Sequence, residues 1–222
     1  MTNFRLLFKT VKASEGATVL MEFAAGLPFF MLTAFGSLEL MNYINMHSIV
    51  SQVALSVADS TSRSLEDSMT PTPIRESDIK DAFAGAQLQQ GSLNFSEHGR
   101  IIVSSLEGAA DPSDANNVIQ TVGWQRCWGG WTERRSEYKL ERYPQGMGAG
   151  GNKIKAPLGG AVMFVEVYYQ YQPILVDPTW LPESARILSY HAAYSVRDPR
   201  SYGTGVQSQA GVTPASSDCG KV

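Results

Sequence analysis

Few residues in this 222-residue chain have the types and spacings that chemistry requires. The histidines His47, His98 and His191 lie far apart and lack the spacing of metal ligands. Two cysteines without a nearby histidine do not form a zinc site, and no serine lies in a G-x-S-x-G nucleophile elbow. The sequence therefore predicts no catalytic residue, no metal and no cofactor, and we expect a protein that is not an enzyme.

The glycine-rich run at residues 146–151 matches the spacing G-x-G-x-x-G. A dinucleotide site needs such glycines to follow a strand and to open a helix. Here Tyr143-Pro144 precedes the run and Lys153–Pro157 follows it, so the pattern does not indicate a helix start. We interpret the run as a flexible loop, and its composition suits a mobile surface flap.

Basic and aromatic side chains are interleaved between residues 124 and 143, a mixture that can bind nucleic acid. Glu133, Glu137 and Glu141 cancel the local positive field, and the net charge of −3 gives no reason to expect a nucleic-acid partner. We expect a charged, exposed strand or helix beside an aromatic core, which is a candidate protein-interaction face. Its residues are Trp124, Arg126, Trp128, Trp131, Arg134, Arg135, Tyr138, Lys139, Arg142 and Tyr143.

Residues 16–38 form one apolar stretch, and its only ionisable side chain is Glu22. As a helix it spans roughly 33–35 Å, enough for the hydrocarbon core of a bilayer. Arg5, Lys9 and Lys12 precede it, and the positive-inside rule then keeps the N-terminus in the cytoplasm. A cleaved secretory signal would need a shorter apolar region, and a core helix of a soluble protein would not explain the charge asymmetry.

Glu22 itself needs an explanation, because a carboxylate in a membrane segment costs a few kcal/mol and is usually paired or functional. In the simpler alternative, Glu22 lies near the cytoplasmic interface, where water reaches it.

The run Gly16–Ala24, with Glu22-Phe23-Ala24 inside it and Leu27-Pro28 just after it, resembles the N-terminal signature of the TadE/TadG family. These are minor pilin-like proteins of the tight-adherence (Flp-type) pilus system. The likeness covers about residues 14–60, a fifth of the chain.

The resemblance implies that a prepilin peptidase cuts behind a small residue. A carboxylate one turn later then neutralises the new amine of a neighbouring subunit, which makes a buried charge tolerable. In processed members this glutamate is fifth after the cut, whereas a cut behind Gly16 makes Glu22 sixth. A cut behind Ala17 restores the spacing and leaves Thr18 as the first mature residue; alternatively, the protein stays unprocessed as a membrane anchor.

Cys127 and Cys219 both follow the apolar segment, so export would place them in an oxidising compartment where they can pair. The bridge would close a loop of about 92 residues, which the chain-entropy model values at roughly 4–5 kcal/mol.

Helical periodicity continues beyond the bilayer, where Met46, Ile49 or Val50, Val53 and Val57 form one apolar stripe. One helix over about residues 15–65 is therefore expected. Further along the chain, we expect Ser77 to cap a helix that runs through about Leu88. Expected strands are a hairpin of residues 93–95 and 101–106, then 118–122, 161–171 with one apolar face, and 187–196.

The predicted fold class is α+β: a long N-terminal transmembrane and amphipathic helix packed on a small antiparallel sheet, as in pilins. The expected layout is a basic leader at 1–15, a membrane helix at 16–38, its periplasmic continuation at 39–65, a periplasmic domain at 66–200 and a flexible tail at 201–222 held by Cys219. The expected location is the bacterial inner membrane as a single-pass protein, with other pilins or pilus-base proteins as partners. A tethered periplasmic enzyme or binding module is the alternative from another functional class.

Overall fold

The computed structural model describes the backbone of residues 15–63 and 70–219, and their side chains except at 15–17, 115 and 116. The predicted basic leader, up to residue 14, and the predicted helix end at residue 65 lie outside the described residues. The chain forms two units that we describe separately: Met1–Ile44 with Pro173–Asp177, and Asn45–Gln172 with Pro178–Val222.

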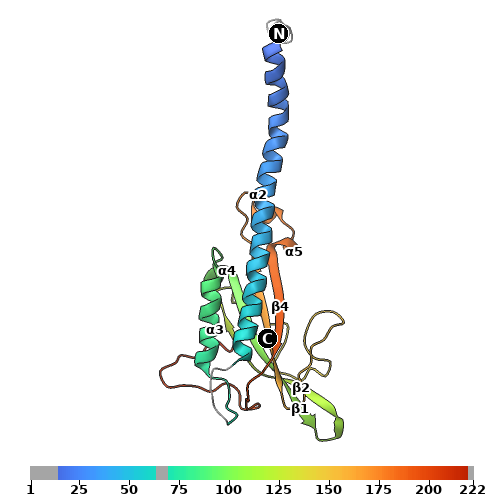
Figure 1. The fold of residues 1–222 in the computed structure, drawn as a ribbon, viewed down its shortest axis with the longest axis vertical. Coiled ribbons are helices and arrows are strands. Elements are labelled where there is room, and N and C mark those ends of the chain that lie inside the picture. Colours follow the sequence, from blue (N-terminus) through green and yellow to red (C-terminus); the bar gives the residue numbers. More distant parts are fainter. Residues whose placement is uncertain (1–14, 64–69, 220–222) are drawn as a thin grey trace. The chain divides into compact units, whose positions relative to one another are not determined.

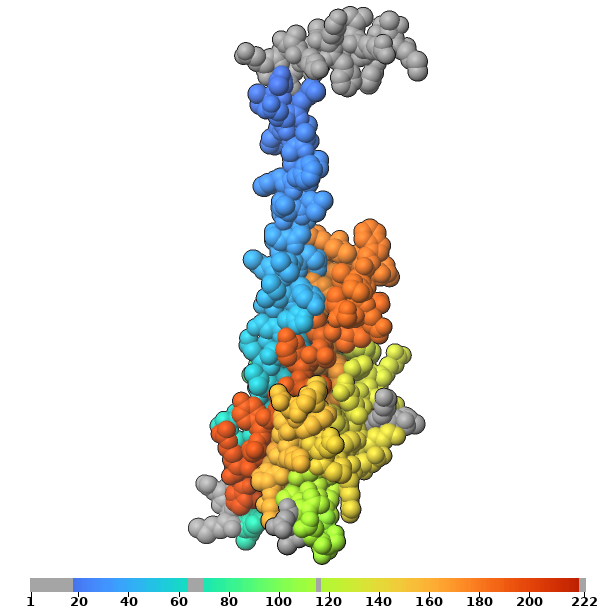
Figure 2. Space-filling model, turned by 90° about the vertical axis from the view of Figure 1, so that its right-hand side faces the viewer, coloured from blue at the N-terminus to red at the C-terminus, as the bar shows by residue number. Residues whose placement is uncertain are grey.

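The first unit is dominated by the start of α2, a single helix that runs from Glu15 to Ser62. Between residues 18 and 44, which we call the exposed half of α2, large apolar side chains stand out from the helix (Figure 2, blue). Two hydroxyl groups in this half donate to their own helix, Thr33 to the Phe29 carbonyl at 3.0 Å and Ser37 to the Ala34 carbonyl at 2.8 Å. Such back-bonding satisfies a hydroxyl that has no water to bind. By length and composition, α2 can cross a membrane.

The second unit contains the rest of α2, residues 45–62, which we call the packed half. Its buried side chains include Met46, Val50, Val53 and Val57, so the predicted apolar stripe is confirmed. The spacing of three and four residues places these side chains on one face of the helix, toward the sheet. His47 marks the contact, because its Nδ1 lies 2.9 Å from the hydroxyl of Tyr190 on β4.

The sheet is antiparallel with four strands in the order β2-β1-β3-β4 (Figure 1). Its strands are β1 (Gly99–Asp111), β2 (Asp114–Trp128), β3 (Ala161–Gln170) and β4 (Ile187–Ser195). The short elements are α3 (Glu76–Gln89), α4 (Phe95–His98), η1 (Pro178–Trp180) and α5 (Glu183–Arg186). The predicted α+β layout, with a long N-terminal apolar helix and a small antiparallel sheet, is present.

Both faces of the central strand β3 are buried, whereas the sequence analysis expected one apolar face. The packed half of α2 and α3 cover one face, where Phe83 of α3 stacks on Trp128 of β2 at 6.5 Å between ring centroids. On the other face the strands pack against irregular chain that includes Tyr138, Met147 and Ala156. An irregular covering layer has no periodicity, which is why the pattern of apolar residues did not predict it.

The predicted hairpin of residues 93–95 and 101–106 is wrong. Leu93 and Phe95 are buried anchors around α4, and Phe95 packs on Tyr169 of β3 at 5.3 Å between ring centroids. The hairpin is β1–β2, and its turn is stabilised by the carboxylate of Asp111, which accepts the Ser113 backbone N–H at 2.9 Å. An aspartate that bonds backbone two residues on is a typical turn former.

Helix α3 begins two residues earlier than the predicted cap at Ser77 implies. Arg75 is the N-cap residue, and its backbone N–H donates to the carboxylate of Asp78 at 3.2 Å. Ser77 donates its own backbone N–H to the side chain of Gln209 at 3.1 Å. Ile79, Phe83 and Ala86 are buried and form the inner face of the helix.

The C-terminal segment differs from the expected flexible tail held by Cys219. Its described part, residues 201–219, forms backbone hydrogen bonds with residues 72–76. The Ser201 N–H donates to the Thr72 carbonyl at 3.2 Å, and the Gln207 N–H donates to the Ile74 carbonyl at 2.8 Å. Further on, the Cys127 N–H of edge strand β2 donates to the Ser216 carbonyl at 2.8 Å. The segment is therefore part of the domain and covers a stretch of exposed strand edge.

Candidate functional site

The exposed half of α2 carries the residues for which the sequence predicts a role in assembly. Gly16 and Ala17 lie in the first turn of the helix, and Thr18 is exposed one turn before Glu22. Residues four apart share a helix face, so Thr18 and Glu22 lie on the same side. The Glu22 side chain is exposed among apolar residues. In a bilayer this carboxylate would need a partner from outside the segment or the water of the interface.

Cys127 and Cys219 form a disulfide, as expected from the sequence, with 5.7 Å between their Cα atoms. Both are buried, and they pack in one cluster with Ile102 and Tyr168. The bond joins edge strand β2 to the C-terminal segment, so it fixes the covering segment at its far end.

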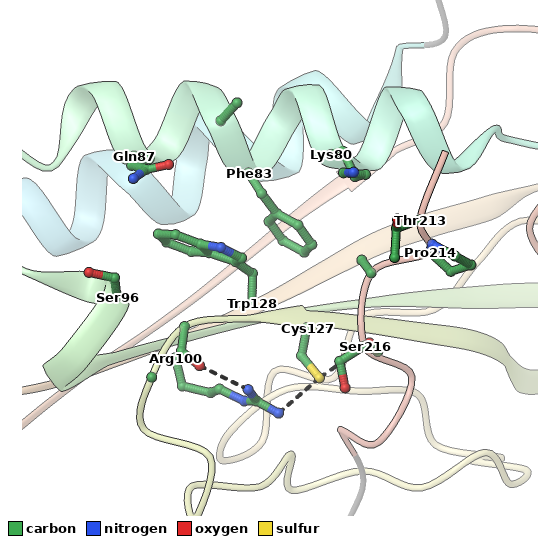
Figure 3. A pocket seen from close by; sticks show the side chains of 14 residues that line it. Lys80, Phe83, Gln87, Ser96, Arg100, Cys127, Trp128, Thr213, Pro214 and Ser216 are labelled. Carbon is green, nitrogen blue, oxygen red and sulfur yellow. Dashed lines mark hydrogen bonds between the residues drawn. The ribbon is translucent and has the colours of Figure 1, made fainter. Parts of the chain in front are cut away.

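Arg100 is a buried cation beside this disulfide that the sequence analysis missed. The residue is only 4% exposed, and its guanidinium donates to the Gly129 carbonyl at 3.1 Å (Figure 3). It also donates to the Asp218 carbonyl at 3.3 Å. Burial lowers the pKa of the Arg100 guanidinium, and Arg135 lowers it further, while Asp218 acts in the opposite direction. No signal in the sequence separates Arg100 from an exposed strand arginine, because its partners are backbone carbonyls far along the chain.

A cavity of about 570 Å³ lies between α3 and β2, with Trp128 and Phe83 side by side on one wall (Figure 3). Lys80, Gln87 and Arg100 supply its longer polar side chains. The described residues that line it include no carboxylate, histidine or free thiol. This lining offers no acid–base pair, and it suits contact with an apolar or aromatic group more than proton transfer.

A buried polar network fixes the irregular layer to the sheet. The carboxylate of Glu166 on β3 is fully buried and accepts the Tyr168 hydroxyl at 2.8 Å and the Glu137 backbone N–H at 3.0 Å. The Ser136 hydroxyl also donates to it. Burial and the nearby Glu166 carboxylate raise the pKa of Tyr168. Glu137 and Ser136 stand outside any strand, so the network gives this part of the chain a defined position.

The interleaved basic and aromatic residues do not form the exposed strand or helix that the sequence analysis expected. Residues 129–142 are irregular, and Trp124 is buried. Arg126 binds the carboxylate of Glu76, and the guanidinium of Arg134 lies 4.2 Å from the centre of the Tyr168 ring. Most of this mixture therefore stabilises the domain from within.

The glycine-rich run is a loop, as predicted, and its glycines meet backbone requirements. Gly146 has a φ of 85°, and a Cβ there would lie 2.1 Å from the Ile154 carbonyl oxygen. Met147 and Ile154 exchange backbone hydrogen bonds at 3.0 and 2.7 Å, so the run closes an ordered turn. No helix follows it, and it lacks the geometry of a dinucleotide site.

The histidines remain separate in the folded chain. His47 contacts Tyr190, His98 lies 3.8 Å from Glu97, and His191 packs beside Phe164. Among the described residues, no group of three or more histidine, cysteine, aspartate or glutamate side chains could hold a metal ion.

Comparisons of the chain with protein-family models, with curated proteins and with solved structures find no match.

Proposed function

We propose that this chain is a membrane-anchored structural subunit of a bacterial tight-adherence pilus, of the minor pilin-like kind. The observation that carries the proposal is the division of α2 into two halves: large apolar side chains are exposed between residues 18 and 44, and burial begins at Met46. A helix that is apolar all round belongs in lipid or in a bundle of like helices, whereas an amphipathic helix packs on a domain.

The position of Glu22 supports assembly through the exposed half. Its resemblance to the glutamate of the TadE/TadG signature assigns it to the amine of a neighbouring subunit. If Thr18 is the first mature residue, its amine lies about one helical turn from the Glu22 carboxylate along the same helix. The amine of a neighbouring helix at the same depth lies at the same axial distance from this carboxylate. A charge pair inside an apolar bundle is tolerated because each member satisfies the other.

The disulfide supports the proposed orientation. Disulfides persist in oxidising compartments such as the periplasm, and Cys127 and Cys219 both lie on the C-terminal side of α2. An N-terminus in the cytoplasm and a domain on the other side of the inner membrane place both cysteines in that oxidising compartment.

The test is mass spectrometry of the N-terminus of the membrane-extracted protein, together with Glu22→Ala. A new N-terminus at Ala17 or Thr18 and loss of pilus assembly in the variant are expected. Glu22→Leu serves as a second variant, because it keeps the helix and its bulk while removing the charge. Normal assembly with both variants would refute amine pairing. An intact leader would instead favour an anchored assembly factor that never enters the filament, and a soluble cytosolic protein with reduced thiols would refute the anchor.

A further inference from the structure

The connection between β3 and β4 contains a short exposed segment that belongs to the same unit as the exposed half of α2. This segment, Pro173–Asp177, has no helix or strand. Its side chains Ile174 and Leu175 are 69% and 50% exposed. Single exposed apolar residues are common on soluble proteins, so their exposure alone has no meaning.

Their position relative to α2 is what makes them informative. The carboxylate of Glu39 accepts the backbone N–H of Ile174 at 3.1 Å and that of Leu175 at 2.9 Å. Residues 173–177 therefore lie beside α2 at the level of Glu39 (Figure 2). Two backbone donors on one carboxylate also satisfy much of its hydrogen-bonding capacity, so it needs less water.

Glu39 lies near one end of the exposed apolar surface. It is the first ionisable residue after Glu22, and Leu40, Met41 and Ile44 beyond it are still exposed. Ile44 is about 7–8 Å further along the helix axis. If the exposed half of α2 spans a bilayer, Glu39 lies in the interfacial layer, and so do the two backbone groups bound to it.

We propose that residues 173–177 form a second membrane contact, in which Ile174 and Leu175 enter the periplasmic leaflet beside α2. This inference rests on the membrane span of the proposed function. Burying these apolar side chains in lipid is favourable, because it removes apolar surface from water. Their backbone donors are not exposed to hydrocarbon, because Glu39 binds them.

The test uses the full-length protein in lipid nanodiscs with its native disulfide intact, so that an added cysteine is the thiol that reacts. Ile174→Cys is labelled with a small fluorophore and quenched in turn by doxyl-labelled lipid and by aqueous iodide. Phe30→Cys in the exposed half of α2 reports the membrane span, since Phe30 is 73% exposed. Leu88→Cys on α3 is the matched aqueous control, since Leu88 is 88% exposed.

The expected result is that labels at positions 30 and 174 are quenched by the doxyl lipid and that iodide quenches the label at 174 several-fold less than the label at 88. If position 30 is in lipid but position 174 behaves like position 88, the second membrane contact is refuted and the membrane span stands. If position 30 itself is open to iodide and not to the lipid quencher, the membrane span is refuted, and the second contact with it.

Discussion

Arg126 on β2 binds Glu76 at the start of α3, with its Nε donating to the Glu76 Oε1 at 2.7 Å. The Glu76 carboxylate is almost fully buried, and its other oxygen accepts the Ala215 backbone N–H at 3.4 Å. The Glu76 backbone N–H donates to the Gln207 carbonyl at 3.1 Å. One residue therefore joins the sheet, a covering helix and the C-terminal segment.

Glu76→Gln should destabilise the domain by about 3–5 kcal/mol, because it leaves the Arg126 guanidinium without a counter-charge in a largely buried site. Urea unfolding of the detergent-solubilised protein, followed by tryptophan fluorescence, measures the loss. The matched control is Asp59→Asn on α2, which removes the exposed ion pair with Arg63, the residue that follows the helix, and should cost no more than about 0.5 kcal/mol.

The double variant Glu76→Gln with Arg126→Met sharpens this prediction. It removes the charged partner as well, so it should recover part of the stability that Glu76→Gln loses. Equal losses in Glu76→Gln and Asp59→Asn would contradict the assignment of Glu76 as a buried junction.

Loss of the disulfide should destabilise the domain and release the end of the C-terminal segment. Cys127→Ser with Cys219→Ser removes closure of a 92-residue loop, a loss of about 4–5 kcal/mol in the chain-entropy model. Proteolysis should then begin within residues 210–219, because Ser201 and Gln207 keep their backbone hydrogen bonds to residues 72–74. Mass spectrometry of the first fragments locates the cut.

The control for the disulfide is the response to a reducing agent. Reduction should lower the unfolding midpoint of the wild type and leave that of the double serine variant unchanged. A wild type with the same midpoint and cleavage pattern in both redox states would show that the bond does not stabilise the segment.

The stability of the domain should fall on mild acidification because of His47. Burial lowers the pKa of this imidazole below its usual 6.5. The unfolded chain therefore binds more protons than the folded chain as pH drops below that value, and protonation favours unfolding. Below about pH 6.5 the free energy of unfolding should therefore decrease as the pH falls toward the lowered pKa of His47.

His47→Gln should flatten this part of the pH profile, measured by urea unfolding at several pH values. Tyr190→Phe is the matched control: it keeps the partly buried imidazole and removes only the hydroxyl 2.9 Å from its Nδ1, so the slope should remain. An unchanged slope in His47→Gln would assign the pH dependence to other groups.

The regular, apolar parts of the chain could be predicted from the sequence, and the parts held by long-range polar contacts could not. The predicted helix over residues 15–65 corresponds to α2, and the strands at 161–171 and 187–196 correspond to β3 and β4. These elements have strong periodicity or β-rich runs, so local pattern suffices. The cysteine pair could be predicted because only one intramolecular pairing exists.

The missed features have no local signature. The alternation of apolar and polar residues around Phe95 is typical of a strand, but the Phe95 side chain packs on Tyr169, far along the chain. Ser77 is a favourable cap by type, yet Asp78 and Gln209 decide where α3 begins. Arg100 and Glu166 are buried by partners from irregular segments, and neither the charge nor the spacing of these residues in the sequence reveals such partners.

Glu39 should control how residues 173–177 meet the membrane. Glu39→Ala removes the acceptor of the Ile174 and Leu175 backbone N–H groups, and two unsatisfied donors are costly at the edge of hydrocarbon. In Glu39→Ala combined with labelled Ile174→Cys, quenching by aqueous iodide should therefore rise toward that of labelled Leu88→Cys. Glu39→Gln is the matched control, because its amide oxygen still accepts a hydrogen bond without the charge, and it should keep most of the protection. Labelled Phe30→Cys should stay in lipid in both backgrounds, since α2 retains its apolar surface. If Glu39→Ala leaves the iodide quenching at position 174 unchanged, the carboxylate does not hold the segment at the interface.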